Sequence, residues 1–587
     1  MHKRFLIPTA LGLFLVIYVL SDVHASDDSS PRSLQSKTFS ERIASASGKT
    51  LYIDETQADI TIIGSEGNEI TAEALVEVKD SDREFVEQYL EHTELILEPY
   101  RGGFRVALET PHHRGSGREG GDFTRLFNRL FHGDYHLSVS AELEIRVPAR
   151  QSLDVENEYG DVHIQNVTGS MTVDNTSGEV VIEDCGGELD LKNSYASVEV
   201  LEFKGSINVE ASSGDVSLEH IMGNAFVENS YKTVRFTRID GSLIIDSQSS
   251  YVYGSHVLGD CEIRTSYKEI DVRRVRGRLE IDGGSCVVSV NDVSKDAVIA
   301  NSYKSVTVDS VGGALTVNGQ SSDVTAENVV GDVSIESSYK PIRAEHVQGD
   351  LTIRSQSSPV DVRDVAKNVS IRTSYKMIQV EDVRGSLEID GSSCPVTARD
   401  IVGEVSIISS YKDILVENVG GGLSIRTGSG TITARDIKKD VTVVSTYKPL
   451  QFYDIGGDLE VDGGSCSVMA ENIVGDVKVT NSYKYVVLKG TSGSIYVRGS
   501  SSPIEVSGIR TLPAEARIEL VTTYKPITLT LPPDANVAIS AESTYGKIRS
   551  DFPVYLNDDE KSARLELGEG SVFVRLETSQ DITLRKE

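Results

Sequence analysis

A tyrosine followed directly by a lysine recurs at a constant interval through most of this chain, and successive pairs are 36 residues apart. Tyr159 and Tyr195 extend the tyrosine series in the same register, although no lysine follows them. An aromatic face beside an ammonium group can stack on a sugar ring and pair with an acidic substituent. The pairs are Tyr231 and Lys232, Tyr267 and Lys268, Tyr303 and Lys304, Tyr339 and Lys340, Tyr375 and Lys376, Tyr411 and Lys412, Tyr447 and Lys448, and Tyr483 and Lys484.

These pairs admit two interpretations. Halfway between successive tyrosines the same position is a serine, as at Ser321 and Ser357, so large and small side chains alternate. In a packing role, each ring would lean across the small neighbour, with its hydroxyl and the lysine pointing to water or to a carboxylate. In a binding role, the tyrosines would form a strip for glycans, with rings about 9.6 Å apart, which is two strand spacings. We take the sixteen residues as a candidate ligand-binding strip.

The sequence offers little that indicates catalysis. It contains no G-x-S-x-G elbow, no H-E-x-x-H pair and no phosphate-binding loop. Acidic residues recur throughout the repeats, and a glycosidase would need two carboxylates at a defined separation. We expect no catalytic residues and no cofactor. A polysaccharide-active β-helix enzyme, either a lyase or a hydrolase, is the alternative.

The cysteines are odd in number and far apart, in a chain whose N-terminal residues predict export. An odd set is no disulfide framework, and structural zinc needs closely spaced pairs. We expect all five cysteines to be small packing residues, and we expect no metal site. They are Cys185, Cys261, Cys286, Cys394 and Cys466.

The segment 123–131, FTRLFNRLF, has one apolar face and two arginines opposite it. A basic amphipathic helix of this kind can touch a membrane surface or a partner, but it can also cap the end of a stack of repeats. We favour the cap. Four nearby histidines lack ligand spacing and are not expected to bind metal. They are His112, His113, His132 and His136.

The 36-residue interval divides into two equal parts. Glycines recur every 18 residues, as at Gly313, Gly331 and Gly349, and lysine replaces them only at Lys295 and at the positions 72 and 144 residues further on. A glycine is the cheapest residue where a chain turns with a positive φ, so we expect each of these glycines to mark such a turn.

Apolar residues alternate with polar ones inside each unit, as they do along a β-strand. Counting from Gly331, Val333 and Ile335 predict one strand, Ile342 and Ala344 a second. Such a unit cannot bury its apolar side alone, but stacked units can. The sequence therefore predicts an all-β protein, a parallel β-solenoid of about 18 residues per coil, with terminal capping modules and one short helix at 82–91.

Four regions follow from this pattern. Residues 1–25 have the basic start, apolar run and small-residue end of a signal peptide, with an uncleaved anchor as the alternative. Residues 26–140 predict an N-terminal module of strands and a helix with a polar, glycine-rich insertion. Residues 141–511 predict the regular solenoid, and residues 512–587 predict capping strands. We expect an exported protein in the periplasm, at the cell surface or outside the cell, with no membrane span after cleavage.

The formal net charge of −31 limits the partners. Nucleic acid and anionic lipid are both repelled by such a surface, because their binding needs clustered Lys and Arg. We expect a cell-wall or acidic polysaccharide, or an envelope protein, and no nucleic acid.

Three segments carry a resemblance to a known family: 58–78, ADITIIGSEGNEITAEALVEV; 141–173, with ARQSLDVENEYGDVHI at its centre; and 527–548, ITLTLPPDANVAISAESTYGKI. The chain resembles the bacterial putative-adhesin family of β-strand-repeat proteins, a family of unknown biochemical function. The resemblance implies an exported parallel β-helix without known catalytic residues. We expect an adhesin-like or structural envelope protein, with a periplasmic protein-binding scaffold as a further alternative.

Overall fold

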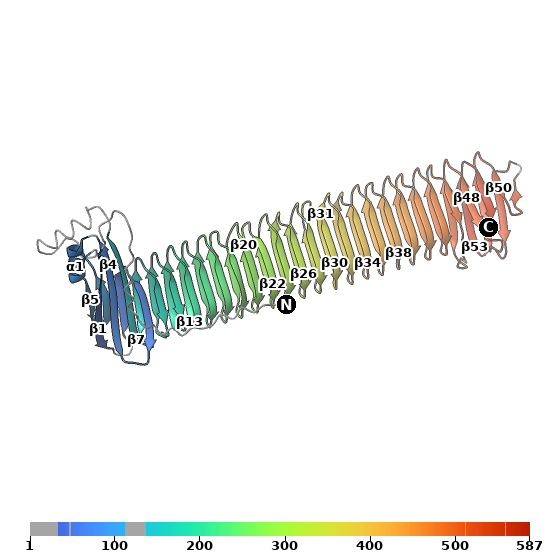
Figure 1. Ribbon diagram of the computed structural model, residues 1–587. Coiled ribbons are helices and arrows are strands. Elements are labelled where there is room, and N and C mark those ends of the chain that lie inside the picture. The colour runs from blue at the N-terminus through green and yellow to red at the C-terminus, as the bar shows by residue number, and fades with distance from the viewer. Residues whose placement is uncertain (1–32, 46–47, 81, 112–136, 511, 558) are drawn as a thin grey trace, which may run out of the picture. The chain divides into compact units, whose positions relative to one another are not determined.

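The computed structural model describes residues 33–45, 48–80, 82–111, 137–510, 512–557 and 559–587. These residues form a parallel β-solenoid of about 20 turns with roughly 18 residues per coil, which confirms the predicted fold class (Figure 1). One short helix, α1 (Arg83–Glu91), occurs in the described part of the chain. The expected signal peptide, the segment 123–131 and the four histidines lie outside it.

The chain divides into two units, and the smaller contains residues 33–40, 74–95 and the described part of 108–142. In this unit the side chain of Asp82 caps α1 by accepting hydrogen bonds from the N–H groups of Glu84 and Phe85. Such a cap satisfies donors that the first helical turn cannot pair internally. The buried residues of α1 are Phe85, Val86, Tyr89 and Leu90, which form its apolar face. The helix predicted at 82–91 is therefore confirmed.

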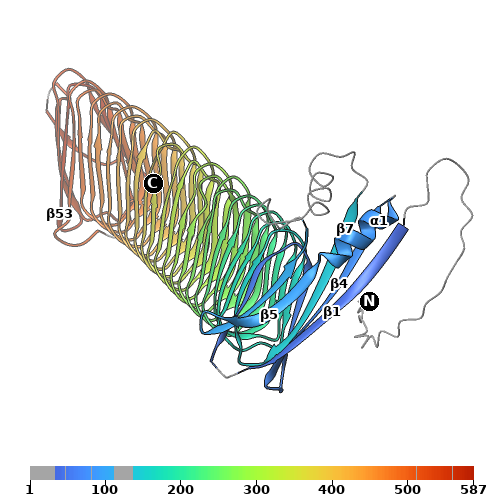
Figure 2. The same cartoon turned by 90° about the vertical axis from the view of Figure 1, so that its left-hand side faces the viewer.

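The larger unit contains the solenoid, in which each coil gives one strand to sheet B and one to sheet A (Figure 2). In one coil these are β27 (Val333–Ser337) and β28 (Ile342–Val347). Strand β27 pairs in parallel with β29 (Leu351–Arg354), and Val333 lies opposite the residue 18 positions later. Every second side chain points inward, so Val333 and Ile335 are both buried. Stacking therefore buries the apolar rows that the sequence shows.

The strands of the stack fall into two series. Sheet B is formed by β2 (Thr50–Thr56), β8 (Ser152–Asn157), β10 (Met171–Asn175), β12 (Gly186–Asn193), β15 (Ala225–Asn229), β17 (Leu243–Ser247), β19 (Cys261–Arg264), β21 (Leu279–Asp282), β23 (Ala297–Ala300), β25 (Leu315–Gln320), β27, β29, β31 (Val369–Ser374), β33 (Leu387–Ser392), β35 (Val405–Ser409), β37 (Leu423–Thr427), β39 (Val441–Ser445), β41 (Leu459–Gly463), β43 (Val477–Asn481), β45 (Ile495–Gly499), β47 (Arg517–Thr522) and β53 (Val572–Thr578). Sheet A is formed by β3 (Asp59–Ser65), β9 (Val162–Gln165), β11 (Val180–Glu183), β14 (Val216–Ile221), β16 (Val234–Ile239), β18 (Val252–Val257), β20 (Glu269–Val275), β22 (Val287–Val293), β24 (Val306–Val311), β26 (Val324–Val329), β28, β30 (Val360–Val365), β32 (Ile378–Val383), β34 (Val396–Ile401), β36 (Ile414–Val419), β38 (Ile432–Ile437), β40 (Leu450–Ile455), β42 (Val468–Ile473), β44 (Val486–Thr491), β46 (Ile504–Ser507), β48 (Ile527–Leu531) and β54 (Ile582–Lys586), and β13 (Val198–Ala211) contributes to both sheets.

The remaining strands belong to the two ends of the chain. At the N-terminal end, β2 and β3 pair with β8 and β9, so one coil of the stack comes from residues that precede α1. At the C-terminal end, β49 pairs with β52 in antiparallel fashion, and β53 and β54 continue the parallel register. These strands are β1 (Ser33–Ala44), β4 (Glu69–Asp80), β5 (Glu94–Tyr100), β6 (Gly103–Glu109), β7 (Ser138–Pro148), β49 (Val537–Ser543), β50 (Ile548–Ser550), β51 (Tyr555–Leu556) and β52 (Ser562–Leu567).

Most of the 18-residue glycines have a different role from the one expected, whereas Gly187 and Gly205 do have a positive φ, of 110° and 145°. A Cβ atom on Gly331 would lie 2.4 Å from the carbonyl oxygen of Gly313 in the preceding coil, and Gly403 meets Gly385 in the same way. Neither glycine is among the residues with positive φ. Close backbone approach between coils therefore selects glycine here. The expected positive φ falls three residues earlier instead, for example 57° at Asn328.

Candidate functional site

Each Tyr-Lys pair lies in the turn that follows a sheet B strand and precedes a sheet A strand. Tyr339 and Lys340, for example, lie between β27 and β28. Because the pairs keep a 36-residue interval and the coils are in register, they fall on one edge of the stack in alternate coils. We call the sixteen residues from Tyr231 to Lys484 defined above the Tyr-Lys edge.

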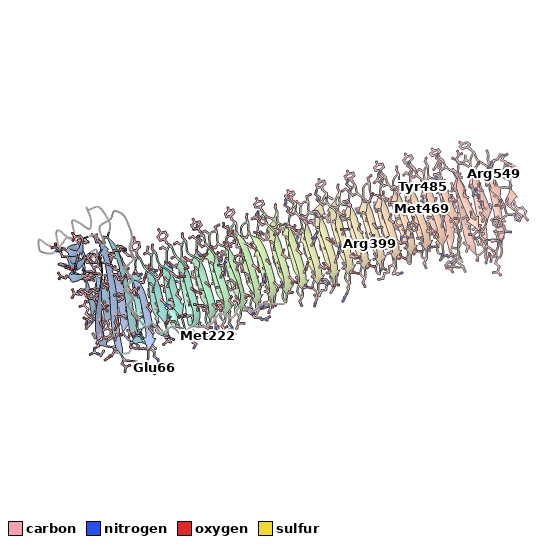
Figure 3. The ribbon with its side chains drawn as sticks, viewed as in Figure 1. Glu66, Met222, Arg399, Met469, Tyr485 and Arg549 are labelled. Carbon is pink, nitrogen blue, oxygen red and sulfur yellow. The ribbon has the colours of Figure 1, made fainter. Side chains whose placement is uncertain are left out.

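The tyrosines of the Tyr-Lys edge face solvent. Their exposed fractions run from 60% at Tyr231 and Tyr339 to 75% at Tyr267. Seven of the eight lysines are exposed as well, and Lys268 is half-buried. In Figure 3, Tyr485 labels this edge of the stack, and Met222 lies at the opposite edge. The edge therefore presents aromatic rings and ammonium groups together on an open surface.

Buried polar side chains inside the stack hold the turns of this edge. The Asn301 side chain donates hydrogen bonds to the carbonyl of Lys304, at 3.2 Å, and to that of Cys286 in the preceding coil, at 2.8 Å. Asn481 makes the same two bonds, to Lys484 and Cys466. A buried carbonyl needs such a partner. The backbone that carries these two pairs is thus held from within.

The intervening coils have a different turn at the same place. In these coils, the residue in register with the lysine is small and fully buried. Examples are Cys286, Ser322, Ser358 and Cys394. Side chains bond to its carbonyl: Ser337 donates to Ser322 at 2.7 Å. An inward-facing position cannot hold an ammonium group. The alternation of two turn types therefore sets the lysine spacing at two coils, about 9.6 Å.

One ring of the edge makes a polar contact with the next coil. The Tyr339 hydroxyl donates a hydrogen bond of 2.6 Å to the side chain of Gln356, which follows 17 residues later. The ring thus extends toward the neighbouring coil, as the packing interpretation expects, while it stays 60% exposed. Lys268 lies over the ring of Tyr251, with its ammonium nitrogen 5.2 Å from the ring centre.

The lysines of the Tyr-Lys edge have no carboxylate within ion-pairing distance among the described residues. Basic residues elsewhere on the stack do: Lys478 lies 2.6 Å from Glu460, and Arg399 lies 2.8 Å from Glu417. The ammonium groups of the edge are therefore available to an external anion, on a chain of net charge −31.

A third row, beside the lysines, was not expected from the sequence. The residue after the lysine position is apolar in four successive coils, as Pro341, Pro359, Met377 and Pro395. These residues are half-buried or exposed, and Tyr485 further along the same row is 46% exposed. A proline can begin a strand because its missing N–H is not needed there. The 18-residue recurrence of proline after the turn was the signal that could have revealed this row.

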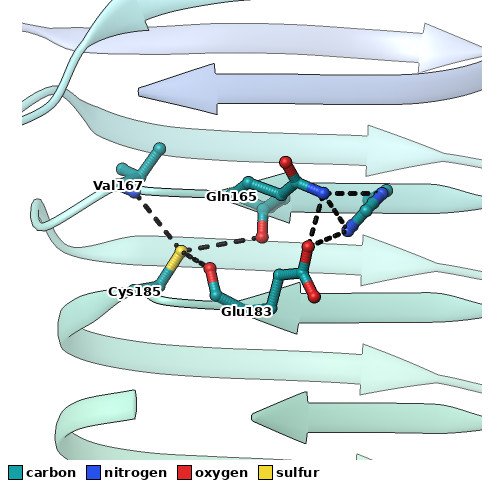
Figure 4. A network of polar contacts seen from close by, with 6 residues as sticks. Gln165, Val167, Glu183 and Cys185 are labelled. Atoms are coloured by element: carbon teal, nitrogen blue, oxygen red, sulfur yellow. Dashed lines mark hydrogen bonds and ion pairs between the residues drawn. The ribbon is translucent and has the colours of Figure 1, made fainter. Parts of the chain in front are cut away.

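The cysteines are free and buried, as expected for packing residues. The Cys185 thiol lies between the N–H of Val167 and the carbonyl of Glu183, to which it donates at 3.1 Å (Figure 4). Burial raises the pKa of Cys185 to about 11 and that of Cys261 to about 12. Neither thiol is therefore an activated nucleophile.

An open groove runs along sheet B and is chemically different from the Tyr-Lys edge. Hydroxyl, amide and carboxylate groups form its walls, and Lys439 lies at one end. These groups can hydrogen-bond to neutral sugars but offer no aromatic face. The polar wall residues are Asp350, Thr352, Asn368, Ser370, Ser386, Glu388, Glu404, Ser406, Ser424 and Asp440.

Two negative findings concern the described residues only. No group of three or more His, Cys, Asp or Glu side chains in them could hold a metal ion. No helix in the same part of the chain has the length and apolar character needed to span a membrane.

Comparison with known proteins gives two structural likenesses. A crystal structure of a putative cell adhesion protein from Clostridium sporogenes is 9% identical, with a TM-score of 0.18, and the match covers 44% of this chain and 100% of that one. A putative adhesin from Bacteroides fragilis is 12% identical, with a TM-score of 0.15, over 60% of this chain and 97% of that one. No protein-family model and no curated protein match the chain.

Proposed function

We propose that the chain is an exported, non-catalytic, adhesin-like β-solenoid that contacts acidic glycans at the cell envelope along the Tyr-Lys edge. The observation that carries this proposal is the row of eight lysines, each beside an exposed tyrosine, with no carboxylate partner in the described residues. Sugar faces stack on aromatic rings, and acidic substituents pair with ammonium groups.

The spacing of the edge supports a polymer as the ligand. Successive lysines lie about 9.6 Å apart, which is close to the length of an extended disaccharide. The Debye length at physiological ionic strength is about 8 Å, so each ammonium acts mainly on the nearest anion. A long acidic glycan would add many weak contacts along the stack, and multivalency of this kind raises affinity without any single strong site.

The test is binding of the full chain to insoluble acidic polysaccharide at low and high salt. We expect Lys304, Lys340, Lys376 and Lys412 changed together to Gln to lose most of the binding, because four pairing groups disappear. The parent's binding should weaken as salt rises. A matched control changes Lys295, Lys367, Lys439 and Lys478 to Gln, which removes the same charge elsewhere on the stack. Equal loss in both variants, or none in the first, contradicts the proposal.

The aromatic contribution is tested with serine, the residue that intervening coils place at the tyrosine position. Tyr303, Tyr339 and Tyr375 changed to Ser should weaken binding while the melting temperature changes little. A lower melting temperature with unchanged binding would instead give the rings a packing role. Incubation of the full chain with the same polysaccharides addresses the enzyme alternative, for which shortened chains would be the positive result.

A further inference from the structure

We propose a second anion-binding site on the opposite corner of the solenoid, where Arg238 and Arg274 take two negative groups of an extended acidic polysaccharide. This site is separate from the Tyr-Lys edge and does not rest on the function proposed for it. It lies where the sheet A strands β16 and β20 end, in the row of residues with positive φ.

The row of positive φ values runs through the whole stack at 18-residue intervals. Most of its members are Asp or Asn, such as Asp364, Asp400 and Asn418, because their short polar side chains tolerate the left-handed conformation. Five successive coils depart from this rule: Glu202 has a φ of 50°, His220 56°, Arg238 65°, His256 64° and Arg274 58°. Histidine is common in the left-handed region, but arginine has no such local advantage, so the fold does not account for Arg238 and Arg274.

The basic residues in this stretch are oriented by one another. Arg274 lies with Nη1 2.9 Å from Nε2 of His256. An arginine N–H can only donate, so Nε2 of His256 is the acceptor of this contact. The other ring nitrogen, Nδ1, lies 3.0 Å from the hydroxyl oxygen of Ser255. The guanidinium of Arg274 is therefore held in place while its remaining donors stay exposed.

Arg238 is exposed and has no ion-pair partner within the described ranges. Carboxylates bound the basic row at both ends. Glu202 lies 2.6 Å from His220 at one end, and Asp292 lies 3.6 Å from Arg276 at the other. Without Lys232 and Lys268, which belong to the Tyr-Lys edge, residues 220–278 contain seven Lys and Arg and seven Asp and Glu, whereas the whole chain carries −31. The site is a short basic segment within an otherwise acidic row.

The separation of the two arginines indicates the ligand. Arg238 and Arg274 are two coils apart, about 9.6 Å along the stack, which is close to the length of an extended disaccharide. The planar guanidinium binds sulfate or carboxylate through two parallel hydrogen bonds, a geometry that lysine lacks. A polysaccharide that presents anionic groups one disaccharide apart fits this spacing.

The test uses the full chain in which Lys304, Lys340, Lys376 and Lys412 are already Gln, so that the Tyr-Lys edge does not contribute. On this background, Arg238→Asn with Arg274→Asn should weaken binding at low salt by at least about tenfold, since two charge-assisted contacts disappear. Titration with a heparin oligosaccharide and with polygalacturonate distinguishes sulfate from carboxylate as the preferred group. The melting temperature should stay equal or rise, because asparagine is a usual residue of this row.

Two further variants complete the test. Arg354→Asn with Arg426→Asn removes the same charge from sheet B and should leave affinity within about twofold of the parent. Arg238→Lys with Arg274→Lys keeps the charge and should retain part of the binding. The proposal is overturned if the background chain binds neither probe, if the sheet B control loses as much affinity, or if the Asn variant keeps its affinity. A clear fall in melting temperature of the Asn variant would make the arginines structural and would also overturn it.

Discussion

At the residue scale, the fold does not require tyrosine and lysine at the positions of the Tyr-Lys edge. Alternate coils place serine at the tyrosine position and a small buried residue such as Cys286 at the lysine position, and they keep the same strands on either side. The turns are held instead by inward-facing side chains such as Asn301. Exposed residues that packing does not demand are the ones on which a binding function can depend.

We expect the inward-facing amide of Asn481 to contribute more to stability than the tyrosine beside it. Asn481→Ala leaves the carbonyls of Lys484 and Cys466 without their donor and should cost about 1–3 kcal/mol of unfolding free energy. Chemical denaturation followed by circular dichroism measures the loss. Asn481→Ser should cost less, because serine donates at the equivalent position in Ser409. Equal stability of the Ala variant and the parent would contradict this role.

The buried thiols should be unreactive in the folded protein. Burial raises the pKa of Cys185 and Cys261 above the ordinary value of 9.0, so both stay protonated at neutral pH. The folded state keeps these protons to higher pH than the unfolded state does, so their contribution to stability is complete below pH 9 and is lost as pH rises through the folded values. A thiol reagent at pH 8 should label no cysteine before denaturation and all five after it. Rapid labelling of the native chain would show that these sites open.

At the scale of the element, each coil has two different backbone features at one corner. A residue with positive φ turns the chain out of sheet A, and a glycine three residues later lets the backbone pass close to the coil before it. The positive φ favours Asp and Asn, whereas the close backbone approach excludes a Cβ atom. This division explains why both residue types repeat with the same period.

Gly331→Ala should destabilise the stack, because its Cβ would lie 2.4 Å from the carbonyl oxygen of Gly313. Overpacking against backbone costs about 1–3 kcal/mol. The matched control is Gly67→Ala, where the nearest atom to a new Cβ is 3.6 Å away and little change is expected. Thermal unfolding of the two variants compares them directly. Similar melting temperatures for both would show that the coils can separate at no cost.

At the scale of the whole molecule, most contacts within the solenoid join neighbouring coils. A strand such as β31 pairs with β29 on one side and β33 on the other. Stability in such a stack is a sum of coil and interface terms rather than the property of one central core. A defect in one coil should therefore act locally.

Ile371→Ala tests this locality, because Ile371 is buried in β31. Removing its side chain should cost about 2–5 kcal/mol. Amide hydrogen exchange should accelerate in β29, β31 and β33 and remain as in the parent in β43 and β45. A uniform acceleration along the stack would indicate one cooperative unit.

The net charge of −31 also acts at this scale. It keeps the surface repulsive to acidic polymers in general, so an acidic glycan can approach only where basic groups are concentrated. The Tyr-Lys edge and the arginine pair, the two sites proposed above, are such concentrations of basic groups, on opposite corners of the coil.

The sequence by itself determined the period, the strands and the class of fold. The 18-residue interval and the alternation of apolar residues such as Val333 and Ile335 are local patterns, and only stacking can bury them. The same interval located the Tyr-Lys pairs on one edge, because residues one period apart must lie in register. The short helix at 82–91 was also readable, from its capping aspartate and apolar face.

Only the tertiary structure decided which of these side chains are exposed and not paired with a neighbouring group. The sequence could not show that the lysines of the Tyr-Lys edge lack carboxylate partners in the described part of the chain, because partners come from neighbouring coils and from side-chain directions. The sequence also could not show whether a repeated glycine marks a close backbone approach or a positive φ, since both favour glycine. The sequence also could not show that Arg238 and Arg274 have a positive φ. The backbone angle at these positions follows from how one coil turns onto the next, and the residue type alone does not determine it.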